Sequence, residues 1–595
     1  MRTVLLNKYN NLLRACGIEN YQSESDSDII YIIKKNIVTF LQECQNVAIW
    51  GAGKHTEMLM SDFIYEMKSI QYVIDSNGAV NENIGYKMIT PNMIAKKEID
   101  GVIISTYRYK EEIKKQMKKY YPNIRYLDIY DVLEDNGIKL CSEYYANDHP
   151  YEKYLKINMY KRIIRKECGK SQKDAWENLI HILIEIKDFL LAIKCVEAYL
   201  LKYGNPKYEK VLDMLKDLYH VQIEAMGNIS KHNVLMLCFD ALRRQDVFGG
   251  NMPNLKKYLD ENTELYDNAY SVSTSTYESL IPAYGNNMNM QTKYYEKNII
   301  KEEDCLFIQK ALQQKRKIHF YTDSTHYIDC EKIEVNESPQ TATEKMWSFL
   351  LDAIDETNGL FYVHILYESH FSYPNPYTEA NVVAGGMSIF FDFLDRNGGA
   401  LKANYEQQHK DAISYLDDVI VPLIQPLRLG MLIYSDHGIP ILSDNMKLEN
   451  VTYPMLTMGN DLIEILFAVK CENMKIGLIS RLESLFEVNN IIISLLDQKQ
   501  YTCPRFDCVK IQRSDIYNPD YHFIYKKLEY DKGLQAFEAF IFKDQSKLVV
   551  YKDGTIELYD KADQLILDDG KSEKYFSLIK EKITVVNINE TKRSN

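Results

Sequence analysis

The 595-residue sequence lacks the features that mark several protein classes. It has no CxxC motif, and its 11 cysteines are scattered, so a zinc ribbon is excluded and we expect reduced thiols. No apolar run approaches the ~20 residues of a membrane-spanning helix. The net charge of −13 argues against a general nucleic-acid binder, which would carry a basic face.

The N-terminal segment, MRTVLLNKYNNLLRACG, has neither a long apolar core nor a small-residue cleavage site. It therefore does not resemble a signal peptide. Together with the scattered cysteines, this leads us to expect a cytoplasmic protein with no membrane span and no nucleic-acid partner. The chain is too long for one hydrophobic core, so we expect two to four domains.

Periodicity and composition divide the chain into four predicted parts. Residues 1–45 have the apolar spacing of helices, interrupted by the polar stretch 23–28. Residues 46–148 alternate short apolar strands with helices, which predicts a Rossmann-like parallel sheet. Residues 149–229 predict a helical connector. Residues 230–595 predict an α/β core followed by antiparallel strands, so the fold class is α/β.

Two predicted strands in the C-terminal part end in residues that can bind a metal ion. NVLMLCFD ends at Asp240, and MLIYSDHG carries Asp436 and His437. The hydroxyl-rich segment 273–285 lies between them. Ligands of open α/β sheets bind at the carboxyl ends of strands. Two carboxylates, an imidazole and a hydroxyl would suit a divalent ion, with zinc or manganese favoured over magnesium or calcium.

A metal-bound threonine or serine oxygen loses its proton more easily and can attack phosphorus. Each of these features also has an ordinary explanation. An Asp at a strand end is often a cap, and a hydroxyl-rich segment is often a solvated loop. Their order along the chain, from Asp through the hydroxyl cluster to His and Asp-His, favours a catalytic site.

This order resembles the sulfatase-like branch of the alkaline phosphatase superfamily over residues 230–575. The first matching segment runs from the strand ending at Asp240 to the loop closing at Gly285, and it includes the tetrapeptides MPNL and NAYS. The second, YVHILYESHFSYPNPY, is similar to the family's His-containing segment. SDHG is similar to its second metal motif, and KLVVYKDGTIELYD to its C-terminal strands.

The nucleophile position distinguishes the branches of this family. Sulfatases use a Cys or Ser modified to formylglycine within a CxPSR-like motif, whereas TYES (276–279) has neither Pro nor Arg. Thr276 resembles the nucleophile of phosphoethanolamine and phosphoglycerol transferases, with Ser275 and Thr274 as alternatives. The resemblance also implies that His370 donates to the substrate or leaving group. The implied metal ligands are Asp240, Thr276, Asp436 and His437.

The sequence departs from this family in three respects. The stretch after SDHG has no His where the family often places one, so a second metal ion is not expected. Ile439 stands where an acid usually follows the motif. The transmembrane helices that precede the catalytic domain of those transferases are missing. His364 fits a core role as well as a functional one. No role is assigned to His319, His326 and His522.

A glycine-rich turn in IWGAGKHTE begins like a dinucleotide fingerprint. Gly51 and Gly53 follow a strand and open a helix, but Thr56 replaces the third glycine. Asp75 stands where a ribose-binding acid is expected. The region resembles Rossmann-like accessory domains of sugar-modifying and sugar-nucleotide enzymes. This implies a nucleotide or sugar-nucleotide ligand, and a purely structural domain is the alternative.

We therefore predict a metal-dependent phosphotransferase or phosphodiesterase that uses Thr276 on a small-molecule or glycan phosphoester. Surface-glycan or polysaccharide modification is the predicted setting, by analogy with the attached sugar-nucleotide-like domain. One alternative is a phosphomonoesterase or sulfatase of the same superfamily. Another is a catalytically degenerate binding or scaffold protein. The sequence leaves the oligomeric state open.

Overall fold

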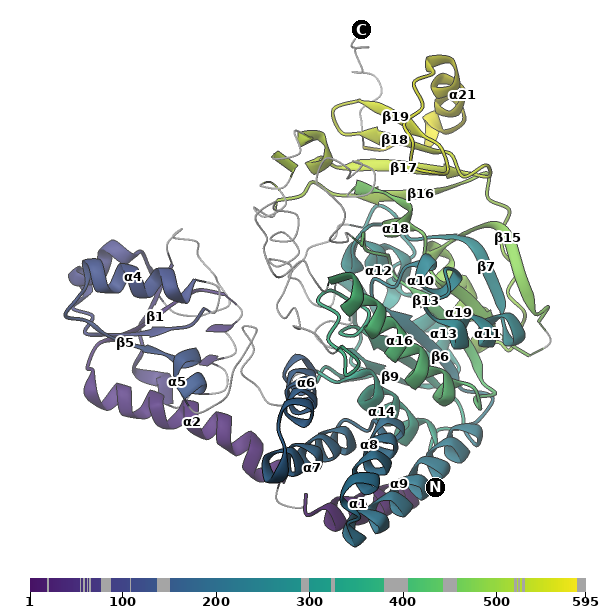
Figure 1. The fold of residues 1–595 in the computed structure, drawn as a ribbon. Helices are drawn as coiled ribbons and strands as arrows, with labels where there is room; N and C mark the ends of the chain where they lie inside the picture. The colour runs from purple at the N-terminus through teal and green to yellow at the C-terminus, as the bar shows by residue number, and fades with distance from the viewer. Residues whose placement is uncertain are drawn as a thin grey trace. The chain divides into compact units, whose positions relative to one another are not determined.

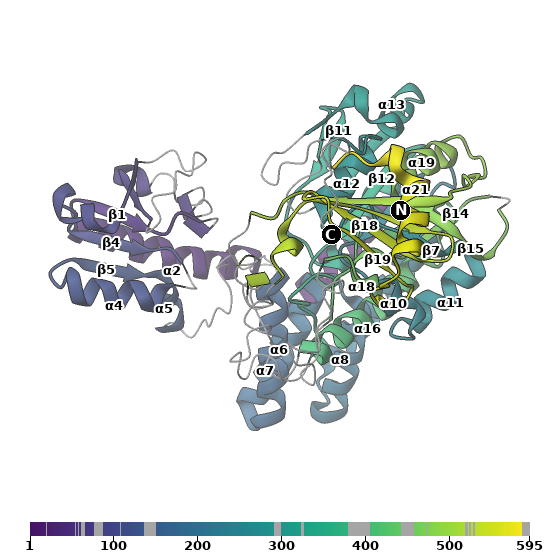
Figure 2. The same cartoon turned by 90° about the horizontal axis from the view of Figure 1, so that it is seen from above.

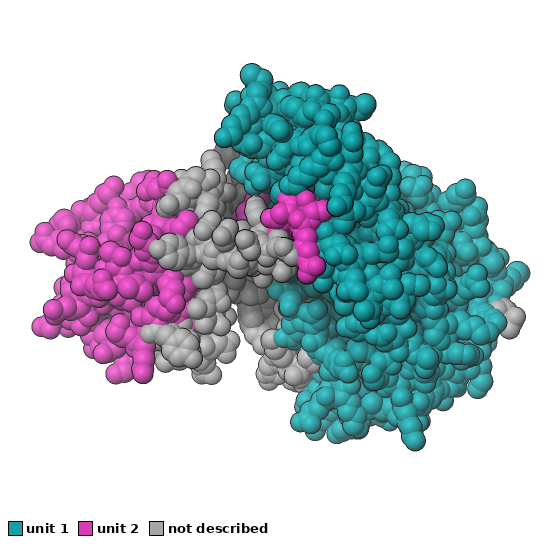
Figure 3. All heavy atoms as spheres, turned by 90° about the horizontal axis from the view of Figure 1, so that it is seen from below, with its two compact units in different colours: residues 1–12, 157–595 teal, residues 13–156 magenta. Residues whose placement is uncertain are grey.

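The computed structural model divides the chain into two compact units. Unit 1 comprises Met1–Leu12 and Ile157–Asn595, and unit 2 comprises Leu13–Lys156 (Figure 3). None of the helices described is long and apolar enough to cross a membrane. His326 lies outside the described residues. The structure describes residues 1–18, 21–53, 55–56, 59–60, 63, 66–75, 87–106, 109–135, 150–290, 299–322, 327–378, 405–441, 457–472, 474–517, 522, 525–526 and 530–585.

The N-terminal segment forms helices α1 (Arg2–Cys16) and α2 (Tyr21–Glu43), as its apolar spacing predicts. The predicted break at residues 23–28 is wrong, because these residues lie within α2. Polar residues are compatible with a helix and do not end it by themselves. The chain turns instead at Gly17, whose φ of +80° suits glycine.

Unit 2 contains a five-stranded, fully parallel sheet in the order β3-β2-β1-β4-β5 (Figure 1). This confirms the parallel α/β pattern predicted here, although the three-residue β3 was not foreseen. Strands β1 and β4 are buried throughout, as expected for a sheet covered on both faces. The elements are β1 (Val47–Trp50), β2 (Tyr72–Ile74), β3 (Lys87–Ile89), β4 (Gly101–Ile104), β5 (Arg125–Asp128), α4 (Lys110–Tyr120) and α5 (Ile129–Asp135).

Gly51 lies between the ends of β1 and β4, where the strand order of this sheet reverses. Its φ is +121°, and an added Cβ would lie 2.7 Å from the Ser105 carbonyl oxygen. The Thr56 hydroxyl lies 2.7 Å from the Gly51 carbonyl oxygen and 2.8 Å from the Ser105 hydroxyl. The close approach of two loops of the protein itself therefore requires a glycine here.

Four helices follow, as predicted for the connector. Gly204 ends one of them in a left-handed conformation (φ +55°), and Asn205 caps the next, which has Pro206 in its first turn. The buried Asp188 accepts a hydrogen bond from the Tyr415 hydroxyl at 3.0 Å, which fixes these helices to a helix of the main domain. They are α6 (Pro150–Lys166), α7 (Gly169–Glu185), α8 (Phe189–Tyr203) and α9 (Pro206–Gly227).

Unit 1 is built on an eight-stranded sheet in the order β11-β9-β12-β6-β13-β14-β7-β15. The first five strands are parallel, and β14 runs antiparallel to both of its neighbours. The strands are β6 (Val234–Phe239), β7 (Glu264–Tyr270), β9 (Lys317–Tyr321), β11 (Ile333–Asn336), β12 (Gly359–Ile365), β13 (Gly430–Ser435), β14 (Phe467–Lys470) and β15 (Gly477–Ser484).

Helices cover both faces of this sheet (Figures 1 and 2). Along β12, Leu360 and Tyr362 join the core beneath α12, whereas Phe361 packs edge-on against Phe349 of α14. Side chains that alternate along a strand thus belong to different helical layers. One layer holds α12 (Thr276–Tyr284), α13 (Leu306–Gln313) and α19 (Val488–Leu496), and the other holds α11 (Pro253–Asn262), α14 (Ala342–Ala353) and α16 (Tyr405–Ile424).

The C-terminal tail forms a separate antiparallel sheet, which confirms the predicted strand-rich end. Its strands lie in chain order, and each pairs antiparallel with the next. They are β16 (Cys508–Arg513), β17 (Phe537–Phe542), β18 (Lys547–Tyr551) and β19 (Ile556–Tyr559), followed by α21 (Asp569–Ile579).

The Gly51→Ala substitution should destabilise unit 2 by about 1–3 kcal/mol, because it places a side chain in a backbone region that only glycine occupies readily. Gly53→Ala is the matched control: no atom of the described residues lies within 4 Å of its added Cβ. Hydrogen exchange of the β1 and β4 amides measures the effect. Equal protection in the two variants would contradict an internal role for Gly51.

Candidate metal centre

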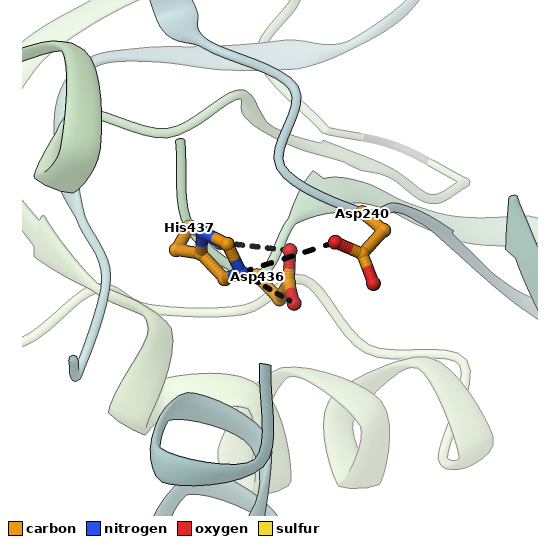
Figure 4. A group of neighbouring side chains, drawn as sticks. All are labelled: Asp240, Asp436 and His437. Carbon is orange, nitrogen blue, oxygen red and sulfur yellow. Dashed lines mark hydrogen bonds and ion pairs between the residues drawn. The ribbon is translucent and has the colours of Figure 1, made fainter. Parts of the chain in front are cut away.

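Two aspartates meet at the carboxyl edge of the main sheet. Asp240 follows β6, Asp436 follows β13, and these strands are parallel neighbours in which Ser435 pairs with Phe239. The two carboxylates therefore leave the sheet at the same level, and His437 joins them (Figure 4). Asp240 is 1% exposed and Asp436 is fully buried.

Thr276 is the first residue of α12 and reaches the same place. Its Oγ lies 3.2 Å from Asp240 Oδ2 and 3.2 Å from His437 Nε2. At the other end of α12, the Tyr284 hydroxyl contacts the Tyr434 hydroxyl of β13 at 2.5 Å. This contact ties the helix to the strand that precedes Asp436. Among the described residues, no comparable contact links Ser275 or Thr274 to the carboxylates.

His437 directs its Nε2 toward the carboxylates. Its Nδ1 lies 2.6 Å from the Gly438 carbonyl oxygen, which can only accept, so Nδ1 carries the proton. In the neutral imidazole, Nε2 would then offer a lone pair to a cation; it lies 3.6 Å from Asp436 Oδ2 and 3.8 Å from Asp240 Oδ1. A histidine held in this way by its other nitrogen is typical of a metal ligand.

The carboxylates keep one oxygen each without a hydrogen bond. Asp436 Oδ1 accepts from the backbone N–H groups of Ala241 at 3.0 Å and His437 at 2.8 Å. Within the described parts of the chain, Asp240 Oδ1 and Asp436 Oδ2 accept none although both are buried. Buried carboxylate oxygens are normally paired or bound to a metal. Ligand atoms of the two aspartates and His437 lie within 4.8 Å of one another, so the residues fit a divalent cation.

The two carboxyl groups differ in their electrostatic surroundings. Burial alone would raise the pKa of Asp240, but the imidazoles of His370, His364 and His437 outweigh it and hold this pKa well below its ordinary value. Burial raises the pKa of Asp436, and the negative charge of Asp240 raises it further. Like charges so close together favour a bound cation.

Two further histidines lie near Asp240. His370 contributes to the low pKa of that carboxyl, and its Nδ1 lies 2.7 Å from the Phe371 carbonyl oxygen, so that Nδ1 donates. His364, on β12, has its Nε2 3.4 Å from Asp240 Oδ2. The sequence left the role of His364 open. The structure places it beside the candidate centre rather than in an apolar core.

A buried charge network beside the centre escaped the sequence analysis. Arg243 donates from Nε to Asp246 Oδ2 at 3.0 Å and from Nη1 to Asp461 Oδ2 at 3.1 Å. His409, on α16, lies 3.4 Å from the same Asp246 oxygen. The spacing of Arg243 and Asp246 after the strand-terminal Asp offered a signal, whereas nothing in the sequence connects His409 with them. His409 and Arg243 outweigh burial and lower the pKa of Asp246.

A close backbone contact explains the glycine of the SDHG motif. A Cβ on Gly438 would lie 2.0 Å from the Asp461 carbonyl oxygen. The Gly438 N–H donates to the Leu462 carbonyl at 2.8 Å. The chain after His437 therefore passes directly against the segment that holds Asp461, which fixes the backbone of the candidate ligand.

The residues predicted for nucleotide binding all belong to unit 2. Gly51 and Gly53 follow β1, and Asp75 follows β2, where its N–H donates to the Ile89 carbonyl at 3.0 Å. Gly51 is explained by its contact with Ser105, and a Cβ added at Gly53 would meet no atom of the described residues within 4 Å. A nucleotide or sugar-nucleotide ligand for this unit stays a prediction.

One family model and several solved structures match parts of this chain. Residues 43–124 match the family model described as C2185-like, N-terminal. No curated protein sequence matches the chain. Three similar solved structures are a phosphonate monoester hydrolase from Silicibacter pomeroyi (10% identity, 59% of this chain and 94% of that one, TM-score 0.42), the lipoteichoic acid synthase LtaP from Listeria monocytogenes (13%, 60% and 91%, 0.39) and BT1596, a 2-O GAG sulfatase (10%, 59% and 91%, 0.40).

Proposed function

We propose that the protein is a metal-dependent phosphotransferase or phosphodiesterase with Thr276 as its nucleophile. The contact of Thr276 Oγ with Asp240 Oδ2 and His437 Nε2, both at 3.2 Å, carries the proposal. A hydroxyl held between a carboxylate and an imidazole nitrogen is positioned to lose its proton. A role as a helix cap would not require either contact.

The cation would be held by Asp240, Thr276, Asp436 and His437. These oxygen and nitrogen donors suit zinc or manganese best. Such a cation lowers the pKa of a bound hydroxyl and draws charge from a phosphoryl oxygen. The residues themselves do the positioning. The Gly438 carbonyl fixes the imidazole of His437, and the Ala241 N–H fixes the Asp436 carboxylate.

The proposed reaction has two displacements at phosphorus. In the first, Thr276 Oγ bonds to phosphorus and the bond between phosphorus and the leaving oxygen breaks. His370 in its protonated form would give that oxygen a proton. In the second, the oxygen of an acceptor hydroxyl or water bonds to phosphorus as the bond between phosphorus and Thr276 Oγ breaks, and the proton of the attacking hydroxyl would return to His370. The enzyme is regenerated, and no oxidant or reductant is needed.

A cytoplasmic role in surface-glycan or polysaccharide modification is part of this proposal. It rests on the resemblance of residues 46–148 to Rossmann-like domains attached to sugar-modifying enzymes, and so on analogy. A glycan phosphoester would then be the substrate. The two-displacement chemistry at Thr276 does not depend on which acceptor completes it.

Thr276→Ala should lower hydrolysis of a chromogenic phosphodiester by at least about 10³-fold, because it removes the nucleophilic oxygen. Metal binding should persist in part, since three proposed ligands remain. Ser275→Ala is the control and should stay active. A phosphomonoester and a sulfate ester assayed in parallel identify the reaction class. Undiminished turnover by the Thr276 variant would eliminate it as the nucleophile.

Asp436→Asn should abolish the stabilisation by Mn²⁺ or Zn²⁺, because a neutral amide is a poorer ligand for the cation. For the unmodified chain, metal at about 100 times Kd should add about 2.7 kcal/mol to the free energy of unfolding. After treatment with a chelator, the Asp436→Asn variant should have a larger free energy of unfolding than the unmodified chain, since it removes one of two adjacent buried charges.

Thermal unfolding with chelator and with added metal measures both effects. Asp417→Asn is the control, since Asp417 is a buried aspartate that accepts N–H bonds at the start of α11, away from the centre. It should keep the full response to metal. An Asp436 variant that responds as strongly would rule this carboxylate out as a ligand.

A further inference from the structure

His364 is a buried histidine on a strand next to the strand that ends at Asp240. It lies on β12, the neighbour of β6 on the side away from β13, where it pairs with Cys238 two residues before Asp240. Its ring shares the face of Tyr362, with which it stacks at 5.8 Å and 20°. This is the face beneath α12, the helix that carries Thr276.

The ring of His364 is held in place but its Nε2 is not saturated. The Lys345 ammonium donates to the His364 carbonyl oxygen at 2.5 Å, which fixes the backbone. The residue is 6% exposed, and Nε2 has no hydrogen-bond partner in the described part of the protein. The Oδ2 atom of Asp240 lies 3.4 Å from Nε2. A small rotation would bring this contact into the usual range of roughly 2.7–3.2 Å.

We propose that His364 is a positioning residue of the metal centre, whose Nε2–H donates to Asp240 Oδ2. Because the carboxylate can only accept, Nε2 must carry the proton in this arrangement. The bond would orient the Asp240 carboxylate and leave Oδ1, which accepts no described hydrogen bond, for the cation. His364 thus acts through Asp240 and does not touch the reacting atoms. The inference rests on the proposed function, since it needs a cation at Asp240.

A second histidine of the same sheet provides a matched control. His319, on β9, is also 6% exposed. Its ring stacks on Phe361 at 5.1 Å, on the opposite face of the sheet, and its Nδ1 lies 3.3 Å from Glu334 Oε2. Replacing His319 therefore removes an equally buried imidazole from the same sheet without touching the carboxylates. Any general effect of losing a buried ring should appear in both variants.

The test is calorimetric titration of the full chain with Mn²⁺. Removing a group that orients a metal ligand typically weakens binding by 10–100-fold. We expect His364→Ala to raise the Mn²⁺ Kd by about that factor. His364→Gln, whose amide N–H can reach the position of Nε2, should restore most of the affinity. His319→Ala should bind as the unmodified chain does.

An unchanged Kd in His364→Ala, or equal weakening in the His364 and His319 variants, would overturn the inference. So would a His364→Gln variant as weak as His364→Ala, because donation by an N–H group would then not matter. Mn²⁺ binding with this pattern but without phosphoester turnover would instead remove the proposed function and leave His364 in place. If the unmodified chain bound no Mn²⁺, the centre itself would be refuted.

Discussion

Two buried carboxylates side by side impose the constraint on which the rest of the site depends. Asp240 and Asp436 end neighbouring parallel strands at the same level, so the topology of the sheet forces their charges together. Backbone N–H groups saturate only one oxygen of Asp436. Burying two such charges without compensation costs several kcal/mol. The surrounding imidazoles, the Thr276 hydroxyl and the proposed cation would each stabilise these buried carboxylates.

The sheet and the helix above it set the geometry before any substrate arrives. β6 lies between β12 and β13, so groups from three strands converge on Asp240. The contact between Tyr284 and Tyr434 anchors α12 in the core, and Thr276 at its first turn inherits that position. Electrostatic catalysis depends on groups that need not reorganise. By holding α12, Tyr284 and Tyr434 would therefore keep Thr276 in position for the proposed chemistry at the carboxyl edge of the sheet.

Much of this site could be predicted because parallel strands bring their carboxyl ends to one edge. The strand-terminal positions of Asp240 and Asp436 therefore sufficed to expect a site without knowledge of the strand order. The role of His364 could not be predicted, because alternation gives its face of β12 but not which strand lies alongside. His409 could not be found either, since only tertiary packing brings α16 to Asp246. The helix break expected at 23–28 failed because polarity alone does not end a helix, whereas Gly17 does.

The two α/β units have carboxyl edges of opposite character. In unit 2, the Thr56, Ser105, His55 and Tyr130 side chains bond one another at the ends of β1, β4 and β5, and Gly51 closes against Ser105. These contacts are hydrogen bonds between neutral polar groups of unit 2. At the carboxyl edge of the main sheet in unit 1, Asp240 Oδ1 and Asp436 Oδ2 are buried carboxylate oxygens that accept no hydrogen bond from any described residue. Because a cation compensates buried negative charge, the proposed metal ion and the proposed nucleophile Thr276 belong at the same edge. The glycine fingerprint of unit 2 does not by itself place an uncompensated charge at that edge.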